Sequence, residues 1–270
     1  MGLATDTEQP STRKPLIQVS DLTMAYGDFV IQQELNFTIR AGDVFIIMGG
    51  SGCGKSTLLR HLIGLQKPAR GKIRFQGKSI WDLDSHERHQ ILRRMGVLYQ
   101  SGALWTHMTL AENVALPLQT YTSLSAEEIG DLVSFKLSLV GLKGFEAYYP
   151  SEISGGMQKR AGLARAMSLD PELLFFDEPS AGLDPVSARR LDELILELSD
   201  SLDTTIVVVT HELASIFAIG DDSVFLDPVC KRMIASGNPN ELLATTDDPR
   251  VREFLTRGDS EVDPNHAIKD

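Results

Sequence analysis

Long apolar runs, cysteine and an excess of positive charge are what this 270-residue sequence lacks. No stretch approaches the roughly 18 to 20 consecutive apolar residues that cross a bilayer, so we expect no membrane-spanning helix. The two cysteines, Cys53 and Cys230, cannot form a disulfide framework, and a reducing compartment suits them. Asp and Glu number 37 against 26 Lys and Arg, a net charge of −11. That balance argues against a nucleic-acid partner and against direct binding to anionic lipid.

Hydrophobic residues make up 42% of the chain, enough for a sizeable core. Three short segments, residues 44–48, 173–176 and 206–209, are apolar at every position. Strands buried on both faces of a parallel sheet show this pattern, because neither face meets water. A turn and a helical pattern follow each segment. The sequence therefore predicts an α/β core with a parallel sheet.

The remaining segments suggest how the chain is organised. Alternating apolar and polar residues predict strands at 16–19 and 30–39. Residues 104–155 are mostly helical in pattern, with a capping box that starts at Ser125, and we interpret them as an inserted helical subdomain. Asp184 followed by Pro185 predicts the start of another helix. We expect one main domain over 16–240. We also expect a disordered leader, 1–15, and a partly disordered C-terminal extension, 241–270, with a short helix near 251–256.

A phosphate-binding pattern lies directly after the first apolar strand. Residues 49–56, GGSGCGKS, match G-x-x-x-x-G-K-[ST] and precede an apolar helical pattern. Glycines let such a loop turn its backbone N–H groups toward phosphates, and the helix N-terminus adds positive partial charge. Lys55 would reach the β- and γ-phosphates, and the Ser56 hydroxyl would bind Mg²⁺. We predict a nucleoside triphosphate site formed by Gly49, Gly50, Ser51, Gly52, Cys53, Gly54, Lys55, Ser56 and Thr57.

Cys53 stands inside this loop and allows two interpretations. We favour a small side chain that fills space. The alternative is a thiol whose pKa is lowered by the helix N-terminus, so that bound ATP protects it from alkylation.

Five further features resemble the motifs of ABC (ATP-binding cassette) ATPases, in that family's order over about residues 16–239. They are the signature SGGMQ at 154–158, the Walker B strand FFDEP at 175–179, the D-loop SAGLD at 180–184, the switch histidine in THE at 210–212, and Gln100 at the Q-loop position. The resemblance implies a P-loop NTPase (RecA-like) parallel-sheet core with an N-terminal antiparallel β subdomain and an inserted helical subdomain.

The resemblance also implies an ATP hydrolase and assigns roles to its residues. Glu178 would be the general base, His211 would orient water and the γ-phosphate, and Gln100 would sense the γ-phosphate. Mg²⁺ would be held by Ser56, Gln100 and Asp177, since hydroxyl, amide and carboxylate oxygens suit that cation. Tyr26 stands where the family stacks an aromatic ring on the adenine.

The signature would serve the ATP bound by a second copy of the chain. Ser154, Gly155 and Gly156 open a helix and would offer N–H groups to that phosphate, with Asp184 of the D-loop beside them. One chain would then hold two half-sites. In this interpretation ATP joins two copies into a dimer.

Met157 in the signature, together with residues 100–105, 108–114 and 167–171, resembles a subgroup, the ATPases of MCE-type (Mla) phospholipid transport systems. That resemblance implies a peripheral subunit on the cytoplasmic face of the inner membrane, which drives a separate permease with an MCE-type lipid-binding protein. A small accessory protein is a further partner in this interpretation. The system would maintain the lipid asymmetry of an outer membrane, and residues 103–114 would receive the permease's coupling helices.

Three other functions share part of this pattern. The ATPase of an importer for amino acids or similar solutes would share every catalytic motif. A soluble ABC ATPase acting as an ATP-gated clamp usually carries two cassettes or long insertions, together with basic surfaces. A regulator that binds ATP without hydrolysing it would be expected to lack Lys55, Glu178 or His211, and all three are present.

Overall fold

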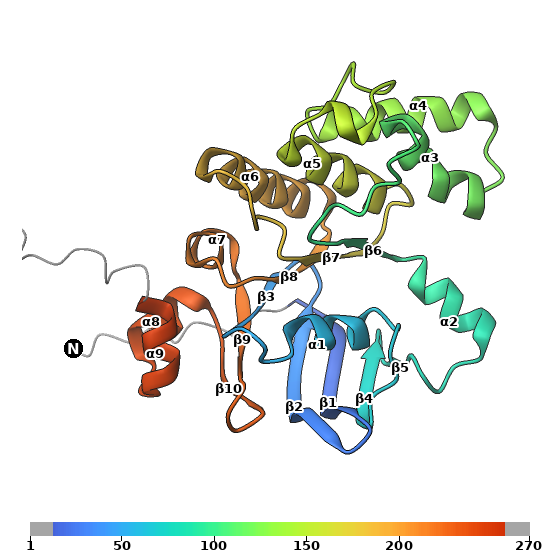
Figure 1. Ribbon diagram of the computed structural model, residues 1–270. Coiled ribbons are helices and arrows are strands. Elements are labelled where there is room, and N and C mark those ends of the chain that lie inside the picture. The colour runs from blue at the N-terminus through green and yellow to red at the C-terminus, as the bar shows by residue number, and fades with distance from the viewer. Residues whose placement is uncertain (1–12, 257–270) are drawn as a thin grey trace, which may run out of the picture.

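The computed structural model describes residues 13–256, so most of the expected leader and the last part of the expected extension lie outside the described residues. Helices α3, α4 and α5 form one layer above a six-stranded sheet, and a four-stranded sheet lies below it (Figure 1). The strands are β1 Pro15–Tyr26, β2 Phe29–Arg40, β3 Val44–Gly49, β4 Arg70–Phe75, β5 Lys78–Ser79, β6 Met95–Leu98, β7 Leu173–Asp177, β8 Thr205–Val209, β9 Asp222–Asp227 and β10 Arg232–Ser236. The helices are α1 Lys55–Leu62, α2 Ser85–Leu92, α3 Leu110–Tyr121, α4 Ala126–Leu139, η1 Pro150–Glu152, α5 Gly155–Ala166, α6 Pro185–Leu202, α7 Leu213–Ile219, α8 Pro239–Thr245 and α9 Pro249–Thr256.

The six-stranded sheet has the order β10-β9-β3-β8-β7-β6. Its strands β9, β3, β8, β7 and β6 are parallel, and β10 pairs antiparallel with β9 at one edge. Alternate residues of β3 enter two different hydrophobic clusters: Val44 and Ile46 face the helical layer, whereas Phe45 and Ile47 face the lower sheet. Both faces are covered, which explains why this strand is apolar at every position. The predicted parallel core is confirmed.

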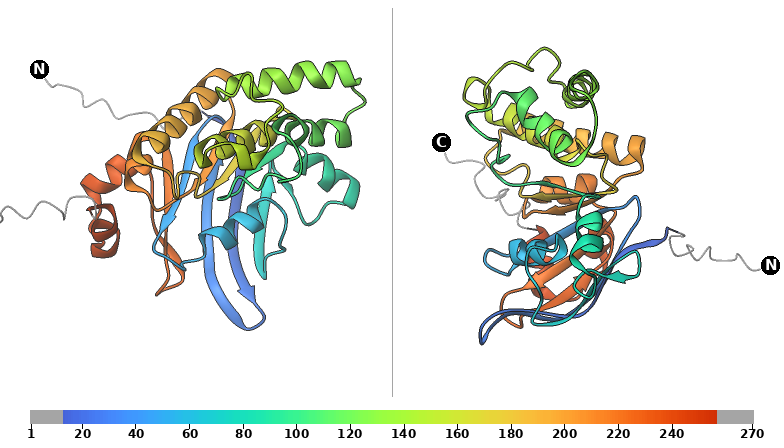
Figure 2. Two further views of the ribbon diagram at one scale, coloured as in Figure 1. Left: turned by 45° about the horizontal axis from the view of Figure 1, so that its top comes forward. Right: turned by 90° about the vertical axis from the view of Figure 1, so that its right-hand side faces the viewer.

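The second sheet is antiparallel, with the order β2-β1-β4-β5. It contains both strands expected near the N-terminus, although β1 is longer than the predicted 16–19 and begins at Pro15. Register shifts around Leu22 and Met24 bend β1, so the strand can extend well past the apolar alternation that predicted it. The inner face of this sheet packs with α1 against the parallel sheet (Figure 2).

The helical layer begins with two capping boxes. In α4 the Glu128 N–H donates to Ser125 Oγ (3.3 Å) and the Ser125 N–H donates to Glu128 Oε2 (2.7 Å), as the sequence predicted. Thr109 and Glu112 form the same motif at α3. Helix α5 starts at the end of the expected range 104–155 and packs into the same core. The shared cluster includes Leu110, Val114, Leu118, Leu137, Ala161, Leu163 and Ala164.

Helix α6 starts where Asp184 and Pro185 predicted it. Asp184 Oδ1 accepts the N–H groups of Val186 and Ser187, each at 3.0 Å. The expected helix near 251–256 is confirmed as α9, whose Phe254 ring contacts Phe225 of β9 edge-on at 5.0 Å. Helix α8 was not predicted.

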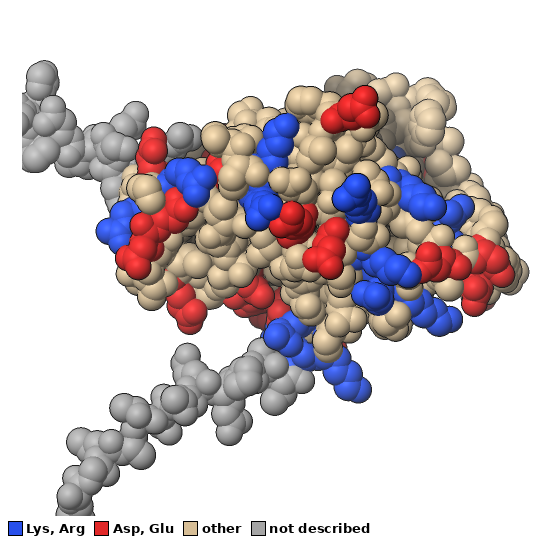
Figure 3. All heavy atoms as spheres, turned by 90° about the horizontal axis from the view of Figure 1, so that it is seen from below, with Lys and Arg blue, Asp and Glu red and all other residues tan. Residues whose placement is uncertain are grey.

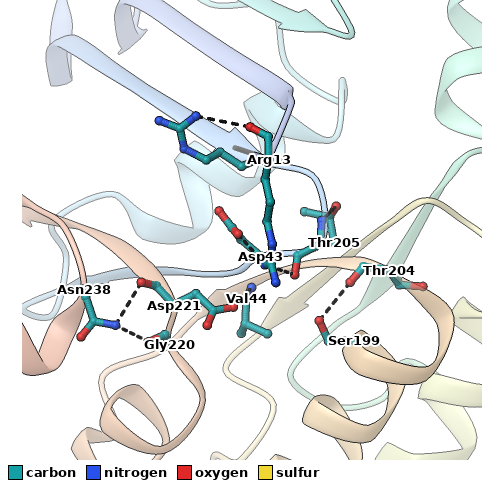
Figure 4. A network of polar contacts seen from close by, with 11 residues as sticks. Arg13, Asp43, Val44, Ser199, Thr204, Thr205, Gly220, Asp221 and Asn238 are labelled. Atoms are coloured by element: carbon teal, nitrogen blue, oxygen red, sulfur yellow. Dashed lines mark hydrogen bonds and ion pairs between the residues drawn. The ribbon is translucent and has the colours of Figure 1, made fainter. Parts of the chain in front are cut away.

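A polar network ties together the starts of the parallel strands (Figure 4). Arg13 Nη1 donates to the Gly42 carbonyl and to Asp43 Oδ1, both at 2.7 Å, and the Val44 N–H donates to Asp221 Oδ2 at 2.9 Å. The Gly42 N–H donates to Thr205 Oγ1. These bonds hold together the N-terminal ends of the parallel strands. The candidate site lies at the opposite, C-terminal ends of β3, β7 and β8.

Within residues 13–256 no helix is long and apolar enough to cross a membrane. Seen from below, several Lys and Arg side chains lie close together in the right-hand half of this face, with Asp and Glu side chains beside them (Figure 3).

Candidate nucleotide site

The phosphate-binding loop joins the end of β3 to the start of α1, and two of its glycines are sterically required. Gly49 has φ +146°, and a Cβ there would lie 2.4 Å from the Leu226 carbonyl oxygen. Gly54 has φ +99°, and its Cβ would lie 2.6 Å from Ile31 Cγ2. Side chains at these positions would push the loop away from β9 and β2. Around Gly50 there is open space and φ is not positive, so sterics do not require glycine there.

Lys55 folds back into this loop. Its ammonium donates to the carbonyls of Gly49 (2.9 Å) and Gly50 (3.1 Å) and is largely buried. The cation is therefore held among the loop's backbone groups, at the N-terminus of a helix that has no side-chain cap. Free N–H groups and a positive charge at one point form an anion site.

A cavity of about 1040 Å³ opens over the loop, at the edge where the parallel strands end. Gln100 follows β6, Glu178 follows β7 and His211 follows β8, each within two residues of the strand end, so three adjacent strands place these residues around one cavity. The predicted residues that line the cavity are Tyr26, Gly49, Gly50, Ser51, Gly52, Gly54, Lys55, Ser56, Thr57, Gln100, Glu178 and His211.

Glu178 and His211 are hydrogen-bonded to each other. His211 Nδ1 lies 2.8 Å from Glu178 Oε1, and the other carboxyl oxygen, Oε2, is buried with no hydrogen-bond partner among the described residues. Glu178 adopts a left-handed backbone (φ +49°), which a non-glycine residue enters at a cost. This turn follows β7 directly and aims the carboxylate toward the loop. An unpaired buried carboxyl oxygen is suited to accept a proton from water.

Asp177 does not line the cavity but is joined to it by Ser56. The Ser56 hydroxyl donates to Asp177 Oδ1 at 3.2 Å. Burial raises the pKa of the Asp177 carboxyl, and the charge of Glu178 acts in the same direction, while the Ser56 hydrogen bond opposes both. A desolvated carboxylate next to a hydroxyl and a second carboxylate is a donor set suited to Mg²⁺.

Tyr26 is the last residue of β1, and half of its surface is exposed at the rim of the cavity. Its hydroxyl donates to Gln66 Oε1 at 3.1 Å, which orients the ring. The exposed Phe29, at the start of β2, lines the same rim. The site thus has an aromatic wall, of which sequence reasoning found only Tyr26.

The signature and the D-loop lie apart from this cavity. Ser154 caps α5 by accepting the Met157 N–H at 3.3 Å, and Asp184 caps α6. These two helix starts are neighbours, since a Cβ on Gly156 would lie 3.6 Å from Ser187 Cβ. The predicted residues Ser154, Gly155, Gly156 and Asp184 therefore form a second surface. The Met157 side chain packs partly buried against the core of the helical layer.

Cys53 differs from the other loop residues, and its position contradicts the alternative of a reactive thiol near the nucleotide. Its side chain is buried in the cluster below the parallel sheet, and it does not line the cavity. Burial raises the pKa of the thiol, outweighing the opposite effect of Lys55. The interpretation of Cys53 as a thiol with a lowered pKa is therefore wrong, and the interpretation as a small side chain that fills space is the better one.

Two residues of the site were not predicted from the sequence: one lies beneath the phosphate-binding loop, and the other lines the cavity. Gln32 of β2 is fully buried, and its Nε2 donates to the carbonyls of Cys53 (2.8 Å) and Asp227 (3.0 Å). It thereby ties the loop to β9. Phe254 of α9 reaches the cavity from the C-terminal end of the described chain. No local pattern marks either residue, since both act through segments distant in sequence.

Comparison with known proteins agrees with this arrangement. Residues 32–181 match the family described as ABC transporter. An intermembrane phospholipid transport system ATP-binding protein, MlaF, from Haemophilus influenzae is 42% identical, over 91% of this chain and 92% of its own length. The Escherichia coli protein of the same name is 41% identical, over 89% and 88%. A probable ribonucleotide transport ATP-binding protein, mkl, from Mycobacterium tuberculosis is 44% identical over 88% of this chain, which spans only 66% of that relative's length.

Solved structures share the fold. The protein cbiO1 of Clostridium perfringens, described as part of the ABC transporter complex cbiONQ, superposes with a TM-score of 0.78 at 27% identity, over 90% of this chain and 94% of its own. A dimeric, post-hydrolysis ATP-binding cassette bound to ADP and Pi has a TM-score of 0.75 at 28% identity, over 83% and 98%. The predicted P-loop NTPase fold is confirmed. The chain belongs to the ABC transporter family, as one of its ATP-binding subunits.

Proposed function

We propose that this chain is the ATP-hydrolysing subunit of an inner-membrane ABC transporter, working as a dimer with a separate permease in phospholipid transport. One observation carries the catalytic part. The phosphate loop, Gln100, Glu178 and His211 line one cavity, whereas the signature lies on another surface of the same chain. A second copy supplies the missing half of each site.

ATP binds with its phosphates on the loop N–H groups and Lys55, and with its base against Tyr26. The open loop geometry and the exposed ring at the rim support this orientation. Mg²⁺, when bound, neutralises charge on the phosphate oxygens. Ser56 and Asp177 would hold it, with Gln100 at the cavity wall.

The Glu178 carboxylate, which lines the cavity, accepts a proton from water as the water oxygen attacks the γ-phosphorus, and ADP departs with the electrons of the broken bond. His211 fixes the Glu178 carboxylate through its 2.8 Å contact and faces the cavity, where it orients water and γ-phosphate. Gln100 reports occupancy of the site to the helical layer, because Gly102 and Ala103 after it accept hydrogen bonds from Arg165 of α5.

A groove of about 560 Å³ beside the helical layer suits the permease. Its walls include His89 and Leu92 of α2, Arg93 directly after that helix, Pro117 and Tyr121 of α3, and Arg165 of α5. The Arg93 guanidinium lies 4.7 Å from the Tyr121 ring centre. The α3 residues that line the groove follow the segment 103–114 that the sequence suggested. Arg165 links the groove to the Q-loop, so a permease helix seated there would be coupled to the site.

Phospholipid is the cargo we favour, with an MCE-type lipid-binding protein as a further partner and the cytoplasmic face of the inner membrane as the location. The support is coverage: this chain spans 92% and 88% of the two relatives named for phospholipid transport, but 66% of the mycobacterial one named for ribonucleotides. An importer of amino acids or similar solutes is the second candidate, since it would use the same catalytic residues.

The test is to purify the chain at native abundance from detergent-solubilised membranes and to identify its stoichiometric partners and bound lipids by mass spectrometry. The proposal predicts a permease and an MCE-type protein carrying phospholipid. A permease with a solute-binding protein would replace phospholipid transport by solute import. Recovery without any membrane partner would contradict transport and favour the ATP-gated clamp.

A further inference from the structure

Helix α5 holds two loops by their backbone carbonyls. Near its C-terminal end Arg165 donates to Gly102 and Ala103 in the loop after Gln100. Nearer its N-terminal end, Lys159 Nζ donates to the carbonyls of Pro179 (2.6 Å) and Ala181 (2.5 Å). The second contact joins the helix that begins with the signature to the loop that follows Glu178.

Lys159 is an unusual residue to find in such a place. Only 7% of it is exposed, and none of the ion pairs among residues 13–256 includes it. Burying a cation without a counter-ion is costly, so its hydrogen bonds must compensate. Burial lowers the pKa of the ammonium, while the negative charge of Glu178 acts in the opposite direction. Glu178 is thus close enough to influence Lys159.

The loop that Lys159 holds is anchored at its two ends, by the Glu178 N–H, which donates to the Val209 carbonyl (2.8 Å), and by Asp184, which caps α6. Two tight turns build it: the Ala181 N–H donates to the Glu178 carbonyl (3.2 Å) and the Leu183 N–H to the Ser180 carbonyl (3.1 Å). The buried Ser180 hydroxyl has no hydrogen-bond partner among the described residues. The Pro179 and Ala181 carbonyls flank that residue and converge on the ammonium. Without Lys159 both carbonyls would lose this hydrogen bond, the Pro179 carbonyl in a buried position and the Ala181 carbonyl in a partly buried one, and the turns could shift.

We propose that Lys159 is a positioning residue that locks the loop 178–184 to the signature helix. One end of this loop is Glu178, which faces the chain's own nucleotide, and the other is Asp184, which lies beside Ser154 on the surface facing the partner. Lys159 joins the two half-sites of a chain into one rigid unit. When the signature closes on the ATP bound by the partner, the position of the Glu178 carboxylate is therefore fixed. Lys159 does not line the cavity and acts only through the loop. The inference rests on the proposed ATPase dimer.

The chain offers a matched control. Lys136 of α4 is equally buried, 2% exposed, and its ammonium bonds to Asp170 away from the loop 178–184. Lys159→Met and Lys136→Met each remove one buried ammonium from the helical layer. Lys159→Gln keeps a donor for one of the two carbonyls and provides a second variant if Lys159→Met does not fold. All are made in the full chain and assayed in its membrane complex for kcat, KM and melting temperature, with the Kd for ATP measured on the chain itself.

For Lys159→Met we expect kcat to fall by about tenfold or more, because a displaced catalytic group loses its geometry. Kd and KM for ATP should stay within about twofold of the wild type, since the phosphate loop is untouched. Lys159→Gln should be intermediate, and Lys136→Met should lower the melting temperature with kcat retained. An unchanged kcat, an equal loss in Lys136→Met, or a parallel rise in Kd would overturn the role of Lys159. A wild-type complex without ATP hydrolysis would instead overturn the proposed function, and the role of Lys159 with it.

Discussion

Ser56 and Asp177 come from segments 121 residues apart, yet the Ser56 hydroxyl donates to Asp177 Oδ1 across 3.2 Å. Ser56 lies in the first turn of α1, and Asp177 is the last residue of β7. Helix α1 covers the face of the sheet that includes β3, β7 and β8, so these two oxygens meet at the sheet edge. The contact is where the proposed Mg²⁺ site connects loop and strand.

Asp177→Asn should therefore weaken the binding of Mg²⁺ at the site and leave the phosphate loop intact. We expect the Mg²⁺ concentration for half-maximal ATPase activity to rise by about tenfold, because one anionic ligand is lost. Titration of activity with Mg²⁺ at saturating ATP measures this. The Kd for ATP in EDTA should be close to that of the wild type. An unchanged Mg²⁺ titration would exclude Asp177 from the metal site.

Lys55→Ala should weaken nucleotide binding itself. The ammonium is the positive charge held by the loop carbonyls of Gly49 and Gly50, and its removal should raise the Kd for ATP by roughly 10- to 100-fold. Calorimetric titration of ATP into the chain gives the value. Lys143→Ala, at an exposed lysine of the helical subdomain, is the control and should bind ATP as the wild type does. Equal affinities for both variants would contradict the assignment.

Cys53 should resist alkylation in the folded chain, whether or not ATP is present. Its thiol is buried beneath the loop and its pKa is raised, whereas Cys230 is exposed. Iodoacetamide followed by peptide mass spectrometry should find label on Cys230 before Cys53. Rapid labelling of Cys53 that ATP suppresses would show that the thiol faces the nucleotide after all.

Asp192→Asn should stabilise the protein at neutral pH. Asp192 is buried in α6 and accepts only the Ser215 hydroxyl (2.8 Å) among the described residues, and burial raises the pKa of its carboxyl. A raised folded-state pKa means that stability is lost as pH rises through that pKa, because the buried group becomes charged. Removing the charge should increase the free energy of unfolding by about 1 kcal/mol at pH 8.

The gain from Asp192→Asn should shrink as pH falls toward the ordinary carboxyl pKa, where the wild-type group is protonated too. Thermal melts at pH 8 and pH 5 give the comparison. Asp131→Asn, at an exposed carboxylate of α4, should change the melting temperature little at either pH. A destabilised Asp192→Asn protein at pH 8 would mean that the charge itself is stabilising there.

The features that the sequence predicted correctly are local ones. The apolar residues of β3, the GGSGCGKS loop and the caps at Ser125 and Asp184 each carry their signal within a few residues. Other features depend on distant partners and leave no such signal. Strand β9 begins with the polar residues Asp222 and Ser223, and in its pairing with β3 Ser223 is fully buried and Asp222 partly buried. The contacts of Gln32 with the loop and of Lys159 with the Pro179 carbonyl join segments that only the fold brings together.

The most direct test of the central claim is the molecular mass of the Glu178→Gln chain in solution, measured by light scattering with Mg²⁺-ATP and with Mg²⁺-ADP. Glu178→Gln removes the general base but leaves the phosphate loop and the signature intact, so ATP should bind and persist. The account predicts a dimer with ATP, a monomer with ADP, and almost no hydrolysis. A chain saturated with ATP that stays monomeric would contradict the shared site, and hydrolysis at the wild-type rate would contradict Glu178 as the base.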